Sequence, residues 1–217
     1  DEALESSMIS KQIAKAQKRV ENYYFDIRKQ LLEYDNVAND QRHVIYDQRK
    51  ELLEAEKVST IVDQMFQDVF TDLVTLYIPG ESAQEQWDVE GLCAVLKEEF
   101  QLDLDIEKWL QEDETLQGEA VAEKVVTAAK DAYKEKAKQA DQDSLHKYEQ
   151  VVILQALDKH WRMHLLAMDH LRQSIHLRGY AQKDPKQEYK REAFELFTTF
   201  LENLKFDIVK LLLSVEV

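Results

Sequence analysis

The stretch SKQIAKAQKRVENYYFDIRKQLLEYDNVANDQRHVIYDQRKELLEAEK, residues 10–57, decides the fold because it contains neither glycine nor proline. Its apolar and small residues recur at steps of three, four and seven, which keeps them on one face of a helix. These residues are Ile13, Ala16, Val20, Tyr24, Ile27, Leu31, Tyr34, Ala38, Ile45 and Leu52. The predicted helix is about 70 Å long. One small core cannot cover such a length, so we expect several partners along this strut.

Glycine and proline are scarce in the whole chain, with 4 Gly and 2 Pro among 217 residues. Sheet proteins need these residues for their turns, and here the first of them are Pro79 and Gly80. The predicted fold class is therefore all-α. We expect a long helix packed with an antiparallel two-helix hairpin, and a small helical subdomain inserted between them.

Charge divides the chain into three regions. Residues 1–57 hold 10 basic and 12 acidic residues, residues 58–141 hold 7 and 20, and residues 142–217 hold 11 of each. Nearly all of the net charge of −15 therefore lies in the middle region. This asymmetry predicts an acidic subdomain inserted over 58–141, between two segments, 1–57 and 142–217, that belong together.

The middle region predicts short helices with a core of their own. One helix ends at Tyr77–Gly80, and a charged helix runs from about Glu119 to Lys138. Trp87 and Trp109 are expected to anchor the core, because large aromatic side chains dominate small helical cores.

The last region predicts two antiparallel helices joined by LRGYAQKDP, residues 177–185. We expect Gly179 to take the left-handed conformation that ends a helix, Asp184 to cap the next helix, and Pro185 to lie in its first turn. Residues 178–191 carry five basic and two acidic side chains, a local charge of +3 in an acidic chain. This tip is a candidate contact surface.

Several classes of protein are excluded by composition. A single cysteine, Cys93, rules out a disulfide scaffold and a multi-thiolate metal site. No apolar run is long enough to span a membrane. An acidic chain with a pI near 4.9 is a poor nucleic-acid binder, so nucleic acid is not an expected partner. The chain begins at Asp1 without methionine or a visible leader, and we expect it to be part of a longer protein.

Two stretches resemble one family. KQLLEYDNVANDQR, residues 29–42, is similar to the long scaffold helix of SecA, the bacterial motor of preprotein secretion. IHLRGYAQKDPKQEY, residues 175–189, resembles the tip of that family's two-helix finger. Both stretches are long and unusual, and they occur in the family's order with an insert between them. The resemblance implies that residues 1–57 are the long helix of the helical scaffold, residues 58–141 the helical wing, and residues 142–217 the two-helix finger of the scaffold.

The resemblance implies a function for the parent protein. SecA proteins are ATP-driven translocases that push unfolded preproteins through the SecYEG channel, at the cytoplasmic face of the bacterial plasma membrane. The finger tip would contact the polypeptide and channel, and this role falls here on Arg178, Tyr180, Gln182 and Lys183. Coupling to the motor domains of the same parent chain would fall on residues of the scaffold helix and the finger. These residues are Asn39, Asp40, Arg42 and Trp161.

Comparison with the family also indicates which of its features this chain lacks. The family binds ATP and Mg in its motor domains, but no GxxxxGK[ST] loop occurs here, so we expect this segment to bind no nucleotide and to be inactive alone. The Cys-rich zinc tail of many members is missing as well. An uncovered apolar stripe along the strut would self-associate, so a homodimer is one expected arrangement.

Alternative interpretations stay open. The chain could be a free-standing helical adaptor, and an autonomous enzyme is disfavoured because no nucleophile motif or metal cluster occurs. If the resemblance is set aside, the simplest interpretation of Tyr180 is an ordinary exposed tyrosine. Trp161 is then interpreted as a core residue and Arg42 as a solvated charge. His160 and His164 have the i, i+4 spacing of a helical metal site, but no third ligand accompanies them.

Overall fold

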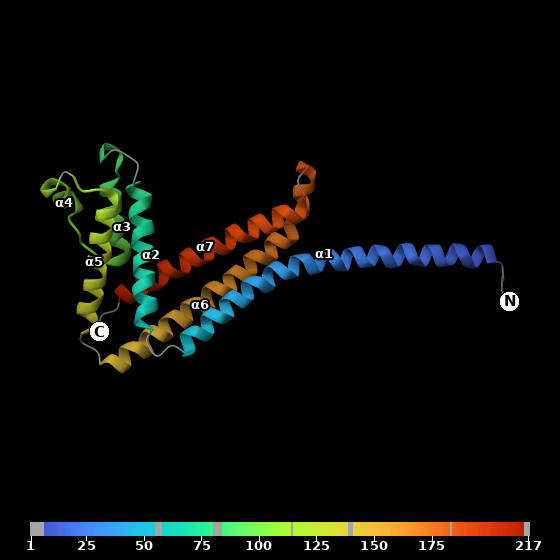
Figure 1. Ribbon diagram of the computed structural model, residues 1–217, viewed down its shortest axis with the longest axis horizontal. Helices are drawn as coiled ribbons and strands as arrows, with labels where there is room; N and C mark the ends of the chain where they lie inside the picture. Colours follow the sequence, from blue (N-terminus) through green and yellow to red (C-terminus); the bar gives the residue numbers. More distant parts are fainter. Residues whose placement is uncertain are drawn as a thin grey trace. The chain divides into compact units, whose positions relative to one another are not determined.

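The chain is all-α, as predicted. The computed structural model describes residues 7–54, 58–79, 84–113, 115–138, 141–182 and 184–214. Within these ranges there are helices and connecting segments and no strand (Figure 1). The long helices are α1 (Ser7–Glu54), α6 (Gln142–Ser174) and α7 (Pro185–Ser214). The shorter ones are α2 (Ser59–Tyr77), η1 (Gln84–Gln86), α3 (Val89–Phe100), α4 (Ile106–Glu112), α5 (Gly118–Ala137) and η2 (Ile175–Ala181), where η marks a 3₁₀ helix.

Local signals set several helix boundaries. The helix predicted over 10–57 is α1, and its 48 residues correspond to about 72 Å. Asp88 caps α3 by accepting a hydrogen bond from the backbone N–H of Gly91 at 2.9 Å, and Asp105 caps α4 through Lys108 at 3.0 Å. α3 ends where Gln101 takes a left-handed conformation, with φ of 59°.

Contacts divide the chain into two compact units. The first unit comprises residues 1–46 and 166–196, and the second comprises residues 47–165 and 197–217. The helices α1, α6 and α7 contribute to both units. This grouping describes packing alone, and the division at residues 57 and 141 inferred from charge stays a prediction.

The first unit contains the hairpin end of α6 and α7 together with part of α1. Its core is formed by aromatic and aliphatic side chains that are at most 7% exposed. They are Tyr34, Met168, Leu171, Ile175, Tyr189 and Ala193. The spacing of Met168, Leu171 and Ile175 shows why this face of α6 is the buried one.

The second unit contains the wing helices, with α2 packed against α5 and α3. Its centre is a chain of rings, in which Phe66 lies 6.0 Å from Phe70, Phe70 lies 4.9 Å from Phe100, and Phe100 lies 4.8 Å from Phe206 of α7. Ion pairs join the wing to α7 at the rim, including Lys205 to Asp68 at 2.6 Å.

The expectation that tryptophans anchor this core is wrong. Trp87 and Trp109 are only half-buried. The ammonium of Lys124 lies 5.6 Å from the centre of the Trp109 ring, a cation–π contact at the surface. Phenylalanines on α2 and α3 fill the centre instead, because these helices bring their narrow apolar faces together there.

Candidate functional site

At the hairpin tip, the second helix begins where the sequence predicts, but the left-handed residue is a different one. α7 begins at Pro185, and the Asp184 carboxylate accepts a hydrogen bond from the backbone N–H of Lys186 at 2.9 Å. Gly179, however, lies inside η2, and the left-handed residue is Gln182, with φ of 59°. A 3₁₀ turn continues α6 past the glycine, so the reversal of the chain is delayed to Gln182. Positive φ is uncommon for a residue other than glycine.

The structure describes the side chains of only two of the four predicted contact residues. Gln182 is exposed, and Arg178 is exposed on η2. The backbone of Tyr180 belongs to η2, but its side chain lies outside the described part of the structure, as does Lys183. The polypeptide-contacting role of all four residues stays a prediction.

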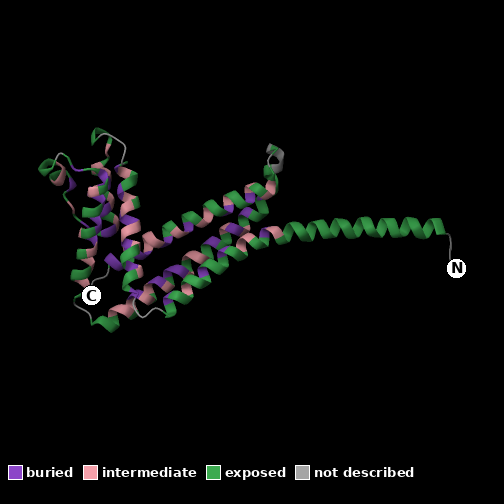
Figure 2. Cartoon of the chain, in the orientation of Figure 1, coloured by how far each residue is buried: buried purple, intermediate pink, exposed green. Residues whose placement is uncertain are grey.

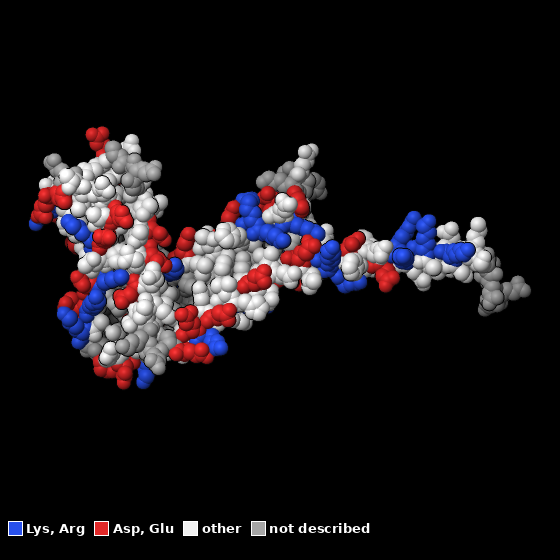
Figure 3. All heavy atoms as spheres, in the orientation of Figure 1, with Lys and Arg blue, Asp and Glu red and all other residues white. Residues whose placement is uncertain are grey.

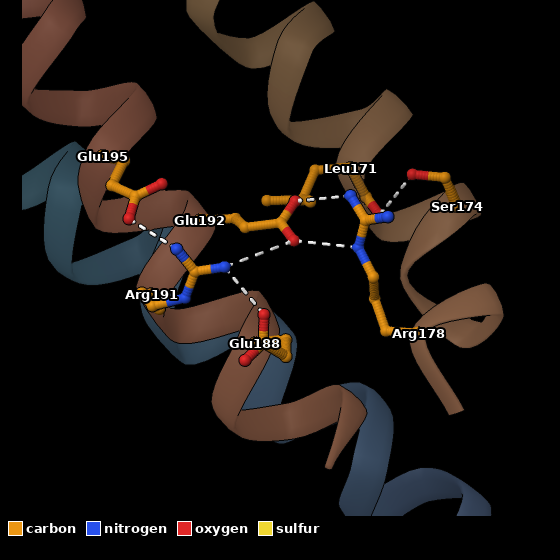
Figure 4. A network of polar contacts seen from close by, with 7 residues as sticks. All are labelled: Leu171, Ser174, Arg178, Glu188, Arg191, Glu192 and Glu195. Carbon is orange, nitrogen blue, oxygen red and sulfur yellow. Dashed lines mark hydrogen bonds and ion pairs between the residues drawn. The ribbon is translucent and has the colours of Figure 1, made fainter. Parts of the chain in front are cut away.

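Arg178 takes part in a network of ion pairs that sequence reasoning missed (Figure 4). Its Nε and Nη2 atoms donate to the two carboxylate oxygens of Glu192 at 2.9 and 3.3 Å. Arg191 donates to Glu188 and to Glu195, each at 2.7 Å, and lies 3.8 Å from Glu192. The spacing of Glu188, Arg191 and Glu195 along α7 could have revealed their pairing. Nothing local could have revealed the pair between Arg178 and Glu192, which are fourteen residues apart.

The hairpin is anchored on α1 by buried contacts. The rings of Tyr34 and Tyr189 meet edge to face, with centroids 4.7 Å apart. The side-chain amide of Gln41 is buried and donates to the backbone carbonyl of Ala193 at 3.0 Å. At the rim, Lys186 pairs with Glu33 at 2.7 Å, and this hydrogen bond lowers the pKa of Glu33. The stretch of α1 that resembles the SecA scaffold helix is therefore the part that holds the finger.

The predicted coupling residues of α1 lie beside this anchor. Asn39, Asp40 and Arg42 are exposed, whereas Gln41 points into the hairpin. The amide nitrogen of Asn39 lies 3.3 Å from the imidazole of His43 one turn later. Trp161 belongs to the other compact unit. The proposed coupling of these residues to a motor stays a prediction.

The first half of α1 is exposed on every side. All residues from Ser7 to Leu32 are exposed, in contrast to the stretch that follows, where buried residues recur among exposed ones (Figure 2). They include large apolar side chains, among them Ile13 at 53% and Val20 at 54% exposure. Basic side chains also gather along this part of α1 (Figure 3). They are Lys11, Lys15, Lys18, Arg19, Arg28 and Lys29.

Trp161 lies in an aromatic cluster of α6 and α7. The His164 imidazole stacks on Trp161 with centroids 5.5 Å apart and lies 5.1 Å from Phe200 and 5.6 Å from Phe197. His164 is 4% exposed, and burial lowers its pKa to about 4. Trp161 is itself half-buried, as its place on the apolar face of α6 indicates.

The two histidines of the i, i+4 pair have separate surroundings. His160 contacts the carboxylate of Asp207 at 2.7 Å, whereas His164 faces aromatic rings. Within the described ranges, no three His, Cys, Asp or Glu side chains lie close enough together to hold a metal ion.

A second buried polar pair joins the wing to α6. The Tyr133 hydroxyl donates to the Glu149 carboxylate at 2.8 Å, and Glu149 is 3% exposed. Burial raises the pKa of both groups. Asp63 raises the pKa of Glu149 further, and Tyr133 and His146 oppose this shift.

The fold and this site define an all-α scaffold segment, in which one long helix holds a helical hairpin and the chain also carries a compact helical wing. The sequence model of the family described as the SecA Wing and Scaffold domain matches residues 3–216. The chain belongs to this family. None of the described helices is long and apolar enough to cross a lipid bilayer.

The sequences of relatives match this chain along its full length. It is 50% identical over 216 residues to the protein translocase subunit SecA of Azoarcus sp. (strain BH72) and 52% identical to that of Aromatoleum aromaticum. The SecA subunit of Legionella pneumophila (strain Lens) is 47% identical. In each case the whole chain is covered, and it spans 24% of the length of the relative.

Proposed function

We propose that the chain is the wing and scaffold part of a SecA preprotein translocase. In this proposal, ATP is bound and hydrolysed with Mg by motor domains elsewhere in the parent protein. The parent acts on unfolded preproteins at the SecYEG channel, on the inner face of the bacterial plasma membrane. The chain itself transmits the motor's movement and hydrolyses no ATP.

One observation carries the proposal, namely the exposed first half of α1. Residues 7–32 place large apolar side chains in water over about 39 Å of helix. Apolar surface of this extent marks an interface with another protein or domain. Because the relatives named protein translocase subunit SecA are about four times longer than the chain, the rest of such a parent protein supplies a partner of sufficient size.

The hairpin supports the finger role within the proposal. The contacts of α1 with the hairpin among the described residues begin at Glu33, and none of them holds residues 7–32 against the tip. A partner on residues 7–32 therefore leaves the tip free to touch polypeptide. A tyrosine suits this task, because its ring contacts varied side chains by area and its hydroxyl can hydrogen-bond to backbone.

The proposal is tested by cross-linking in a full-length parent translocase whose native cysteines, Cys93 among them, are replaced by serine. Tyr180→Cys is combined with a preprotein stalled in the SecYEG channel. We expect a cross-link to the preprotein that requires both ATP and the channel. Glu195→Cys is the matched control, since it is exposed on α7 about 15 Å from the start of that helix.

A cross-link from position 195 that equals the one from position 180 would contradict a specific role of the tip. Cross-links from position 180 only to other parts of the translocase would remove the finger from the mechanism. They would leave the scaffold role in place.

A further inference from the structure

The tip segment η2 is held to the hairpin at two points on one face. Ile175 is fully buried in the core of the first unit, and Arg178 pairs with Glu192 of α7. In a 3₁₀ helix, side chains three residues apart are aligned, so Ile175 and Arg178 share the face that meets the hairpin. Leu177, one of the two residues between them, is 63% exposed. Arg178 is thus directed toward the protein itself.

The geometry of the pair is that of a specific clamp. Two nitrogens of the Arg178 guanidinium meet the two oxygens of one carboxylate, at 2.9 and 3.3 Å (Figure 4). Such a two-point contact fixes the relative orientation of its partners, which a single contact does not. The Glu192 side chain is 19% exposed, so it is well placed to hold one orientation.

The neighbouring charges leave Glu192 available to Arg178. Arg191, the other cation near Glu192, has closer partners in Glu188 and Glu195, both at 2.7 Å, against 3.8 Å to Glu192. These two carboxylates hold Arg191 along α7. The Glu192 carboxylate therefore serves chiefly to join η2 to α7.

We propose that Glu192 is a positioning residue of the finger, whose carboxylate holds Arg178 and thereby fixes the direction of η2. This inference rests on the proposed function, since η2 carries Tyr180. It assigns Arg178 to the support of the tip in place of direct contact with polypeptide. Short 3₁₀ segments have poor hydrogen-bond geometry, so η2 depends on such side-chain anchors for its orientation.

The first test measures amide hydrogen exchange over residues 175–182 in the full-length parent translocase, without channel, preprotein or nucleotide. Glu192→Gln is expected to raise the exchange rates about two- to fivefold, the range for an exposed but well-formed ion pair. Glu195→Gln is the matched control. It removes a carboxylate from the same network, leaves Arg178 paired, and should leave the rates unchanged.

Two further measurements separate a clamp from a general loss of structure. In a double-mutant cycle, Arg178→Gln, Glu192→Gln and the double variant should show the same increase, because all three remove one contact. High salt should raise the exchange rates of the wild type toward those of Glu192→Gln and change the variant little. Additive effects in the cycle, or rates in Glu192→Gln equal to those of the wild type, would overturn the clamp.

The second test repeats the cross-link from Tyr180→Cys to a stalled preprotein with Glu192→Gln added. We expect the cross-link yield to fall with Glu192→Gln and to stay unchanged with Glu195→Gln. An unchanged yield in both would overturn the positioning role. If the exchange results hold but position 180 never cross-links to preprotein, the finger role within the proposed function fails and the clamp stands. If position 180 cross-links normally but the exchange rates do not respond, the clamp fails and the proposed function stands.

Discussion

His164 provides a quantitative test of the packing between α6 and α7. Its imidazole is 4% exposed among the rings of Trp161, Phe197 and Phe200, and burial there lowers its pKa from 6.5 to about 4. The folded chain therefore keeps this imidazole neutral at pH values where the unfolded chain binds a proton. Stability is fully present above the unfolded pKa and is lost as the pH falls from 6.5 toward 4.

The size of this effect follows from linkage. At about pH 5, the proton taken up by the unfolded chain lowers the free energy of unfolding by about 2 kcal/mol relative to pH 7.5. His164→Phe keeps an aromatic ring and removes the titrating group. The difference in stability between the wild type and this variant should therefore change by about 2 kcal/mol over that pH range, because other titrating groups cancel in the comparison.

The assay combines two measurements on the chain. Urea unfolding followed by circular dichroism at each pH gives the stability of both proteins. NMR titration of the imidazole, assigned by its absence in His164→Phe, gives the pKa directly and is expected near 4. A midpoint near 6.5, or stabilities of the two proteins that run parallel from pH 7.5 to pH 5, would show that His164 is not enclosed as the structure describes.

Two other predictions concern buried contacts. Glu149→Gln keeps an acceptor for the Tyr133 hydroxyl and removes a buried charge whose pKa is raised, so the variant should be at least as stable as the wild type at pH 7.5. The free energy of unfolding of the wild type should rise relative to that of the variant as the pH falls through that raised pKa. A variant that is less stable than the wild type at pH 7.5 would contradict the reasoning. Tyr34→Ala removes a ring that is 5% exposed and should cost about 3 kcal/mol of local stability. The rate of amide hydrogen exchange should then rise in residues 166–196 and stay unchanged in residues 59–137. An equal rise in both ranges would mean that the two compact units unfold together.

Much of the fold could be predicted because helix signals are local. The absence of breakers over residues 10–57 and the repeat of apolar residues predicted one helix, and α1 extends from Ser7 to Glu54. Asp184 and Pro185 predicted the start of α7, which the structure confirms. Each of these features depends on residues within a few turns of one another.

Other features could not be predicted because they depend on which faces meet. Trp87 and Trp109 have the size of core residues, yet phenylalanines occupy the centre of the wing. The chain reverses at Gln182 and not at Gly179, because η2 continues past the glycine. Periodicity alone also could not separate the covered part of α1 from the exposed part, since the apolar stripe runs through both.

The sequence by itself determined the all-α class, the long helix, the hairpin and the family, because each rests on residues that are close together in the chain or on a recognisable run of letters. Tertiary structure alone decided that Tyr34 and Gln41 hold the finger, that His164 is enclosed by rings, and that Arg178 pairs with Glu192 across the tip. These contacts join residues from different helices, and their existence depends on how two helix surfaces are rotated against each other. No spacing within one helix encodes that rotation.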